Sequence, residues 1–154
     1  MTATLVHGTA IAVGTTGILI VGRSGAGKTE LALSLLSAAR RAGHFAALVS
    51  DDQVYTEAAH GRIIATPPAA IRGKIEVRGT GIGTQPVIDA AVIALVLEPI
   101  QLTSANRIPE ENQYWESPQG VRLPKLFLDR QHAVPFEALS SVLPGFPAQA
   151  QVRG

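Results

Sequence analysis

The stretch Val21–Glu30, VGRSGAGKTE, is the strongest indication of the fold that we expect for this chain. It contains the phosphate-loop pattern G-x-x-x-x-G-K-[ST], here Gly22, Arg23, Ser24, Gly25, Ala26, Gly27, Lys28 and Thr29. The glycines let the backbone curl until several N–H groups point at one centre, and the positive end of the following helix attracts anions. Lys28 brings a full positive charge to the outer phosphates, and the Thr29 hydroxyl is a ligand for Mg²⁺. The stretch therefore predicts a nucleotide-phosphate site.

The flanks of the loop carry the structure that such a site needs. Ile18–Val21 is apolar throughout, which predicts a central strand covered on both faces. Residues 28–43 favour a helix that ends at Gly43, and residues 44–50, HFAALVS, favour the next strand. A strand, loop, helix and strand in this order predict a right-handed crossover between parallel strands. The fold class is α/β, a P-loop nucleotide-binding domain with a central, mainly parallel or mixed sheet.

The rest of the chain predicts further strands and one more helix. A hairpin turning near His60-Gly61, a buried strand over 90–98 and a short last helix over 135–143 follow from the pattern. Residues 74–83, KIEVRGTGIG, predict an irregular loop after a short strand, and 121–128 an edge strand, because Pro124 cannot donate to a ladder. The polar stretch 99–120 is long for a connection, which is typical of lids and binding loops.

Composition limits the class of protein. The 154 residues fit a single compact domain over 1–154, with a tail that we expect to be mobile from about residue 144. The net charge of +1 indicates no general attraction to nucleic acid, and the lack of cysteine excludes disulfides and thiolate metal sites. The longest apolar run, Ala90–Leu97, is too short for a membrane span, and no basic residue precedes Arg23. We expect a cytoplasmic protein.

Two carboxylates follow the strand after the helix. Asp51 and Asp52 come directly after ALVS, at the strand end where parallel sheets bind ligands. One of them is a candidate to hold Mg²⁺ or its water, and the other to accept a proton from an attacking hydroxyl. Side chains alternate along a strand, so the two are expected to point in different directions, and parity leaves open which one faces the site. The alternative for the pair is a solvated turn or a helix cap.

The loop by itself does not identify the reaction, because switches, motors and kinases all use it. The sequence has no N-K-x-D motif, which argues against a guanine-nucleotide switch, and a motor needs a longer chain.

Several stretches, the loop among them, point to one family. They are His7-Gly8, residues 22–33 (GRSGAGKTELAL), Ser50–Asp52, residues 75–82 (IEVRGTGI) and residues 106–110 (NRIPE). From about residue 5 to 128 the chain resembles the catalytic domain of HPr kinase/phosphorylase, a bacterial regulator of the phosphotransferase system. The phosphate loop is generic, whereas EVRGTGI resembles the signature of that family.

The resemblance implies a reaction and an assembly. In the family, ATP phosphorylates a regulatory serine on the small carrier protein HPr, and inorganic phosphate removes the group with release of pyrophosphate. ATP and Mg²⁺ are the implied cofactors, HPr is the implied partner, and a homo-oligomer is the implied assembly.

The resemblance also implies roles for single residues. Asp52 resembles the general base for the serine hydroxyl and the acid of the reverse reaction, and Lys28 the lysine that stabilises phosphate. The other implied active-site residues are His7 and Arg107; the candidate metal ligands are Thr29, Glu76 and Asp51; the further signature residues are Arg78 and Gly79. Taken alone, His7 is typical of a structural hydrogen-bonder, Glu76 of a solvated strand face and Arg107 of a surface charge.

The chain departs from the family in places. Arg23 stands where the family often has Asp, and Gln53 where it often has Arg. The family's P-V-[KR]-x-G-R-N stretch, linked to dephosphorylation, is not recognisable near the C-terminus, and the long last helix is reduced to Pro135–Leu143. We therefore expect kinase activity to be retained more readily than phosphorylase activity.

Two alternative functions stay open at this point. One is a P-loop kinase whose acceptor is a small molecule. The other is a non-catalytic module that senses nucleotide or phosphate and binds a regulator.

Overall fold

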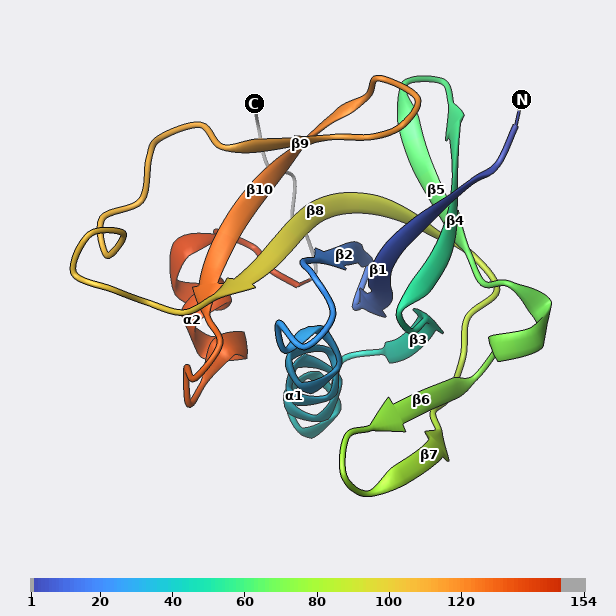
Figure 1. Cartoon of the computed structure of the whole chain (residues 1–154), viewed down its shortest axis with the longest axis horizontal. Helices are drawn as coiled ribbons and strands as arrows, with labels where there is room; N and C mark the ends of the chain where they lie inside the picture. The colour runs from blue at the N-terminus through green and yellow to red at the C-terminus, as the bar shows by residue number, and fades with distance from the viewer. Residues whose placement is uncertain (1, 148–154) are drawn as a thin grey trace.

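The computed structural model describes residues 2–147, which form a curved sheet with helices packed against it (Figure 1). The strands are β1 Thr4–Val13, β2 Thr16–Val21, β3 Ala46–Ser50, β4 Gln53–Ala59, β5 Arg62–Thr66, β6 Lys74–Val77, β7 Gly81–Thr84, β8 Ala91–Ile100, β9 Tyr114–Glu116 and β10 Arg122–Asp129. The helices are α1 Lys28–Arg41, the 3₁₀ turn η1 Ala69–Ile71 and α2 Pro135–Val142.

The main sheet has eight strands and closes on itself. Its order is β2-β1-β4-β5-β8-β10-β9, with β3 beside β1 and a further pairing between β2 and β8. Because β2 pairs with both β1 and β8, the strands β2, β1, β4, β5 and β8 form a ring. In the described part of the chain, the named strands pair in parallel at two places only, β8 with β2 and β8 with β10. The α/β class and the mixed sheet are confirmed, but antiparallel pairs dominate because short turns join β1 to β2 and β4 to β5.

The strand–loop–helix–strand unit has an extra strand inside it. Both β2 and β3 are antiparallel to β1, so they run in the same direction with β1 between them. Helix α1 crosses over β1 to connect them and ends at Arg41. The predicted stop residue, Gly43, follows two positions later with a φ of 85°. The His44 N–H donates to the Ala39 carbonyl and the Gly43 N–H to the Arg40 carbonyl, which is the Schellman arrangement. The carboxyl ends of β2 and β3 therefore lie at the same edge of the sheet.

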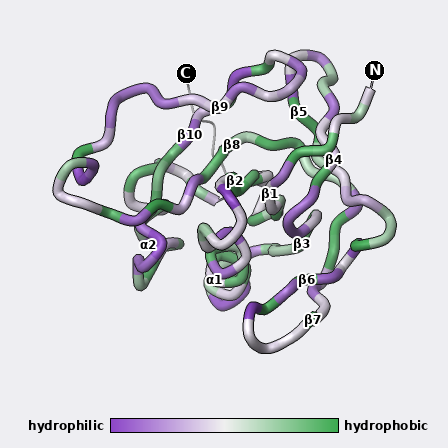
Figure 2. The backbone as a smooth tube through the Cα atoms, viewed as in Figure 1, coloured by the Kyte–Doolittle hydropathy of each residue, from purple (hydrophilic) through white to green (hydrophobic). Residues whose placement is uncertain are grey.

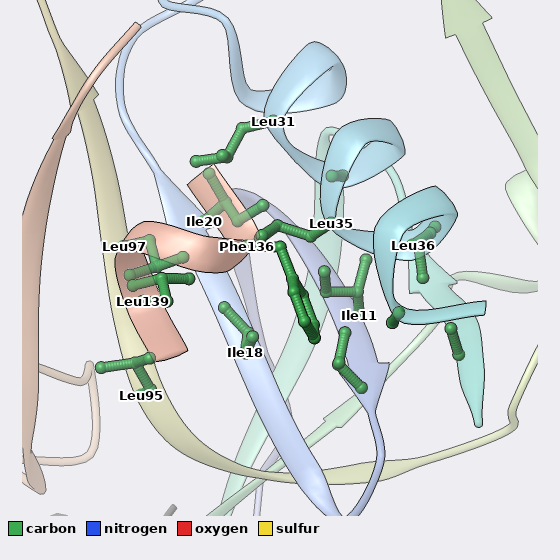
Figure 3. Close-up of a cluster of buried hydrophobic side chains, with 14 of the residues drawn as sticks. Ile11, Ile18, Ile20, Leu31, Leu35, Leu36, Leu95, Leu97, Phe136 and Leu139 are labelled. Atoms are coloured by element: carbon green, nitrogen blue, oxygen red, sulfur yellow. The ribbon is translucent and has the colours of Figure 1, made fainter. Parts of the chain in front are cut away.

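Alternating side chains divide the apolar residues into two cores. In β2, Ile18 and Ile20 face the helices, while Leu19 and Val21 face the inside of the ring. Figure 3 shows the first core, where side chains of α1 and α2 meet those of β2 and β8. Figure 2 shows the contrast between these apolar strands and the mainly hydrophilic connection from β8 to β9. The prediction that β2 is buried on both faces is confirmed.

Three local predictions can be compared with the structure. The hairpin at His60-Gly61 is confirmed, with both residues at positive φ. The irregular loop expected over 74–83 is wrong, because β6 and β7 form a hairpin there. The edge strand expected over 121–128 is wrong, because β10 pairs with β8 over its second half and with the short β9 around Pro124. The strand at the edge of the sheet is therefore β9.

The C-terminal segment is held by the core up to the last described residues. Phe146 is buried against Phe136 of α2, and the Thr16 hydroxyl donates to the Pro147 carbonyl at 2.7 Å. Of the tail expected to be mobile from about residue 144, residues 148–154 lie outside the described residues. No helix within residues 2–147 has the length and apolar character to cross a membrane.

Candidate functional site

A polar cleft of about 280 Å³ lies over the carboxyl ends of β2 and β3. Four segments line it: the phosphate loop with the start of α1, the junction of β3 and β4, the β6–β7 hairpin, and the residue after β10 (Figure 1). The lining residues are Ser24, Gly25, Gly27, Lys28, Thr29, Glu30, Asp51, Asp52, Glu76, Arg78 and Arg130. The cleft thus joins most of the residues that the sequence indicated.

The phosphate loop has the conformation that its glycines predict. Gly22, Gly25 and Gly27 have φ values of 137°, 82° and 99°, which side chains with a Cβ rarely adopt. The Lys28 side chain is only 6% exposed, and its Nζ donates to the Gly22 carbonyl at 2.8 Å and to the Arg23 carbonyl at 3.0 Å. Of the eight loop residues, Gly22, Arg23 and Ala26 shape the loop without lining the cleft.

Asp51 is the buried carboxylate of the pair, at 7% exposure. Its Oδ1 accepts hydrogen bonds from the Thr9 hydroxyl at 3.0 Å and from the Thr29 hydroxyl at 2.9 Å. Its Oδ2 accepts one from the Glu76 N–H at 3.2 Å. Asp51 therefore ties together β1, the phosphate loop and the β6–β7 hairpin. The Thr29 hydroxyl donates its hydrogen bond to Asp51, which leaves the lone pairs of its oxygen available to a cation.

Asp52 is the exposed carboxylate, and its backbone is strained. Its φ is 66°, and the Gln53 N–H donates to the Asp51 carbonyl at 2.7 Å, so Asp52 is the centre of a rare three-residue turn. The strain is held by β1, where the Gly8 N–H donates to the Asp52 carbonyl at 2.9 Å. The Thr9 hydroxyl accepts the Asp52 N–H at 3.1 Å. Strain that neighbouring hydrogen bonds maintain is common at functional sites.

The strand register explains how β1 contributes to the site. Ala10 lies opposite Ser50 and His7 opposite Gln53, so the intervening positions place Thr9 opposite Asp51 and Gly8 opposite Asp52. Sequence reasoning missed Thr9, and nothing in the local pattern GTA marks it. The signal lies in the pairing of β1 with β3 and β4.

His7 connects the exposed carboxylate to the buried lysine. Its Nδ1 lies 3.4 Å from Asp52 Oδ1, and its Nε2 lies 3.4 Å from Lys28 Nζ. The side chains of His7 and Asp52 are 48% and 59% exposed. Lys28, His7 and Asp52 therefore form a row of side chains. The row runs from the interior of the phosphate loop to an exposed surface that a macromolecule can reach.

The β6–β7 hairpin places Arg78 beside the phosphate loop. The Thr80 N–H donates to the Val77 carbonyl at 2.9 Å, and Gly79 in this turn has a φ of 78°, as a type II turn requires. The turn presents Arg78 so close to Gly25 that a Cβ there would lie 3.2 Å from Arg78 Nη1. Gly79 therefore acts through the turn, and the Arg78 guanidinium adds positive charge to the cleft.

The structure does not bring Arg107 to the cleft. It lies in the exposed connection between β8 and β9 and is not among the residues that line the cavity. Arg130, which sequence reasoning missed, lines the cleft instead and follows β10 directly. The Arg130 N–H donates to the Ile100 carbonyl at 2.7 Å, and its Cβ lies 3.9 Å from the Cβ position of Gly27. Its position depends on the pairing of β10 with β8.

The oxygen atoms in the cleft fit a magnesium ion that is also held by phosphates. Asp51, Glu76 and Thr29 offer carboxylate and hydroxyl oxygens, which are the ligands that Mg²⁺ prefers. No group of three or more His, Asp or Glu side chains in residues 2–147 is close enough to form a complete metal site. In other proteins Mg²⁺ is usually bound through one or two carboxylates together with substrate phosphates.

Known proteins resemble the chain in sequence and in fold. The family described as HPr Serine kinase C-terminal domain matches residues 1–133. HPr kinase/phosphorylase of Clostridium beijerinckii is 38% identical over 80% of this chain and 42% of the relative, and that of Malacoplasma penetrans is 29% identical over 77% and 40%. The HPr(Ser) kinase/phosphatase structure from Coxiella burnetii superposes with a TM-score of 0.68 at 20% identity, covering 90% of this chain and 93% of that one. The chain thus spans less than half the length of these curated relatives.

Proposed function

Because this chain belongs to the HPr serine kinase C-terminal domain family, we propose that it transfers the γ-phosphoryl group of ATP to a serine hydroxyl of an HPr-type carrier protein. The serine oxygen forms a bond to the γ-phosphorus, the bond from that phosphorus to the bridging oxygen of ADP breaks, and the serine proton moves to a carboxylate. We place this reaction in the cytoplasm, where ATP is the common donor.

The observation that carries the proposal is the row Asp52, His7 and Lys28. It joins a half-exposed carboxylate to the buried lysine of a phosphate loop through a single imidazole. A carboxylate at the open mouth of the cleft is accessible to a hydroxyl on another protein, and Asp52 is the candidate general base for it.

Charge stabilisation comes from the sides of the cleft. The transferred phosphoryl group spreads negative charge over its oxygens, which cationic groups in fixed positions stabilise. Lys28 is held at the loop by two backbone carbonyls, and Arg78 and Arg130 enter from two other segments. Thr29, Asp51 and Glu76 are the residues that would hold Mg²⁺, which would neutralise phosphate charge when bound.

The same residues suit the reverse reaction in principle. A protonated Asp52 would return the proton to the serine oxygen, while inorganic phosphate takes the phosphoryl group and leaves as pyrophosphate. The sequence lacks the family's stretch linked to dephosphorylation, so we propose that the forward reaction is the stronger one. We also propose a homo-oligomer, supported by the family resemblance alone.

A phosphotransfer assay with purified HPr tests the function. We expect ATP and Mg²⁺ to yield phosphoserine on HPr, and an HPr in which the acceptor serine is alanine to remain unlabelled. In the reverse assay, inorganic phosphate should release pyrophosphate from phosphorylated HPr more slowly than the forward rate. Transfer to a metabolite but never to HPr would overturn the proposal in favour of a small-molecule kinase.

The variant Asp52→Asn separates catalysis from binding. Asparagine keeps the size of the side chain and tolerates the positive φ of this position, but it is not a base. We expect Asp52→Asn to bind ATP as the wild type does and to lose transfer to HPr. If the variant retained full transfer, Asp52 would not be the base; if transfer were absent in both proteins while a regulator still bound, the chain would be a sensing module.

A further inference from the structure

We propose that the open face of β1 and β4 is the docking surface for the acceptor protein. The open face consists of the outward side chains of Leu5, His7, Gln53 and Tyr55. Its apolar pair, Leu5 and Tyr55, receives an apolar side chain of the acceptor, and Arg23 at its border receives an acidic one. The inference rests on the proposed function, because it assumes that the acceptor hydroxyl belongs to a protein. It adds the surface by which the chain distinguishes one acceptor protein from another.

The helices cover only half of the outward face of β1. Ile11 and Val13 point outward and pack in the core beneath the helices, and Thr9, also outward, is fully buried. The next two outward residues towards the N-terminus, His7 and Leu5, are exposed. The open half of this strand face therefore begins at His7, which belongs to the row of side chains in the site.

Strand β4 continues the open face beside β1 (Figure 1). In the antiparallel register His7 lies opposite Gln53, and Leu5 lies opposite Tyr55. Side chains directly opposite each other on one face have Cβ atoms about 4.5–5.5 Å apart, so Leu5 and Tyr55 form one patch. Leu5 is 48% exposed and Tyr55 is 38% exposed. The patch lies two residues from His7, which is about 7 Å along the strand.

The size of a protein contact brings this patch within it. Even a transient complex buries up to about 600 Å² on each partner, which corresponds to a disc that reaches about 14 Å from its centre. The phosphate loop lies on one side of His7, through Lys28, and β4 lies on the other. A protein that brings a serine to Asp52 therefore has the Leu5–Tyr55 patch within reach of its surface.

The chemistry of the patch suits a protein partner. Single exposed apolar side chains are common on protein surfaces, but here two large ones are direct neighbours. Tyrosine offers a large contact area at a low cost in conformational entropy, and it is enriched among the residues that dominate the energy of protein interfaces. Within residues 2–147 the Tyr55 hydroxyl makes no hydrogen bond, so it is free to make one with the partner.

Arg23 adds a positive charge at the border of the open face. Its carbonyl and His7 Nε2 both contact Lys28 Nζ, at 3.0 Å and 3.4 Å, so Arg23 and His7 are close neighbours. The Arg23 side chain is exposed and does not line the phosphate cleft. Among the residues that the structure describes, its guanidinium has no ion-pair or hydrogen-bond partner. A free guanidinium beside the row favours an acidic group on the acceptor protein.

The test measures the phosphorylation of purified HPr by the full chain with ATP and Mg²⁺, at low and at high salt. Leu5→Ser and Tyr55→Ser remove the apolar side chains, and Phe45→Ser removes an exposed aromatic side chain at the remote end of β3 as a control. Arg23→Gln removes the border charge, and Arg62→Gln removes an exposed arginine at the far end of β4 as its control. Titration with inorganic tripolyphosphate reports the phosphate site, and light scattering reports the oligomeric state.

We expect Tyr55→Ser to raise the KM for HPr about tenfold and Leu5→Ser about fivefold, with kcat unchanged at saturating HPr. The reason is that both side chains bind the acceptor without touching the reacting atoms. Arg23→Gln should lower kcat/KM for HPr about fivefold in about 50 mM salt and less than twofold in about 0.5 M salt, because salt screens exposed charges. The two controls should change these constants less than about twofold, and every variant should bind tripolyphosphate within about twofold of the wild type.

Four results would overturn the docking surface. If Leu5→Ser and Tyr55→Ser kept the KM of the wild type while HPr was phosphorylated, the acceptor would dock elsewhere and the proposed function would stand. If both variants weakened tripolyphosphate binding by the same factor, the effect would be on the phosphate site.

The other two results concern the partner. If Leu5→Ser or Tyr55→Ser converted an oligomeric wild type into monomers, the open face would be an interface between copies of this chain. If the effect of Arg23→Gln were equal at both salt concentrations, Arg23 would not bind an acidic group. A wild type that never phosphorylated HPr would refute the proposed function itself, and the docking surface with it.

Discussion

The Thr9 hydroxyl offers the sharpest test of how the fold supports the site. Thr9 is fully buried, donates to the Asp51 carboxylate at 3.0 Å and accepts the Asp52 N–H at 3.1 Å. Thr9→Val replaces the hydroxyl by a methyl group of nearly the same size. It removes one of three hydrogen bonds to a buried carboxylate and the acceptor that helps to hold the strained turn at Asp52.

The expected loss of stability follows from these contacts. A hydrogen bond to a charged group contributes about 1.5–3 kcal/mol, most of it lost when the buried acceptor keeps no substitute donor. For a domain of this size each kcal/mol lowers Tm by about 2–4 °C, so Thr9→Val should lower Tm by roughly 3–12 °C. Because Asp51 also positions the Thr29 hydroxyl, we expect the affinity for Mg²⁺-ATP to fall as well, by about tenfold.

The control is Thr9→Ser, which keeps the hydroxyl and loses a methyl group. Removal of one buried methyl costs about 0.5–1.5 kcal/mol, so this variant should lose some stability but retain its affinity for Mg²⁺-ATP. Thermal unfolding by circular dichroism and titration calorimetry measure the two quantities. If Thr9→Val melted within 2 °C of the wild type, or if Thr9→Ser lost affinity as Thr9→Val does, the hydroxyl would not organise the two carboxylates.

Three further variants test the site and the core. Arg130→Ala should weaken the binding of inorganic tripolyphosphate about tenfold and Arg107→Ala less than twofold, since of the two only Arg130 lines the cleft. If calorimetry showed the reverse order, Arg107 rather than Arg130 would be the phosphate-binding arginine. Gly17→Ala would place a Cβ 2.1 Å from the Val92 carbonyl oxygen, where β2 and β8 close the ring of strands, so the free energy of unfolding in urea should fall by about 3 kcal/mol or more. A variant as stable as the wild type would mean that the ring opens readily at this point. Phe146→Ala should lower the free energy of unfolding by about 3–5 kcal/mol and leave tripolyphosphate binding unchanged, because Phe146 packs in the core on the helix side of the sheet. Unchanged stability would show that the C-terminal segment is not part of that core.

The elements that depend on neighbouring residues could be predicted from the sequence. The phosphate loop, the stop of α1 just before Gly43 and the turn at His60-Gly61 all follow from glycine and turn chemistry within a few residues. The apolar β2 was correctly placed at the centre of the sheet, because strands covered on both faces read as continuous apolar runs. The β6–β7 hairpin was missed because its glycines resemble an irregular loop as much as they resemble a type II turn.

From the residues alone one could predict an α/β chain in which a phosphate loop, two carboxylates and a glycine-rich signature follow one another. The folded chain was needed to show that Asp51 is the buried carboxylate and Asp52 the exposed one, and that Thr9, 42 residues away from Asp51, binds both of them. It likewise put Arg130 rather than Arg107 in the cleft. The physical reason is that glycine conformation and helix ends depend on local sterics, whereas these contacts depend on which strands pair and in which register. That pairing is set by burial of whole strands, and no short stretch of sequence contains it.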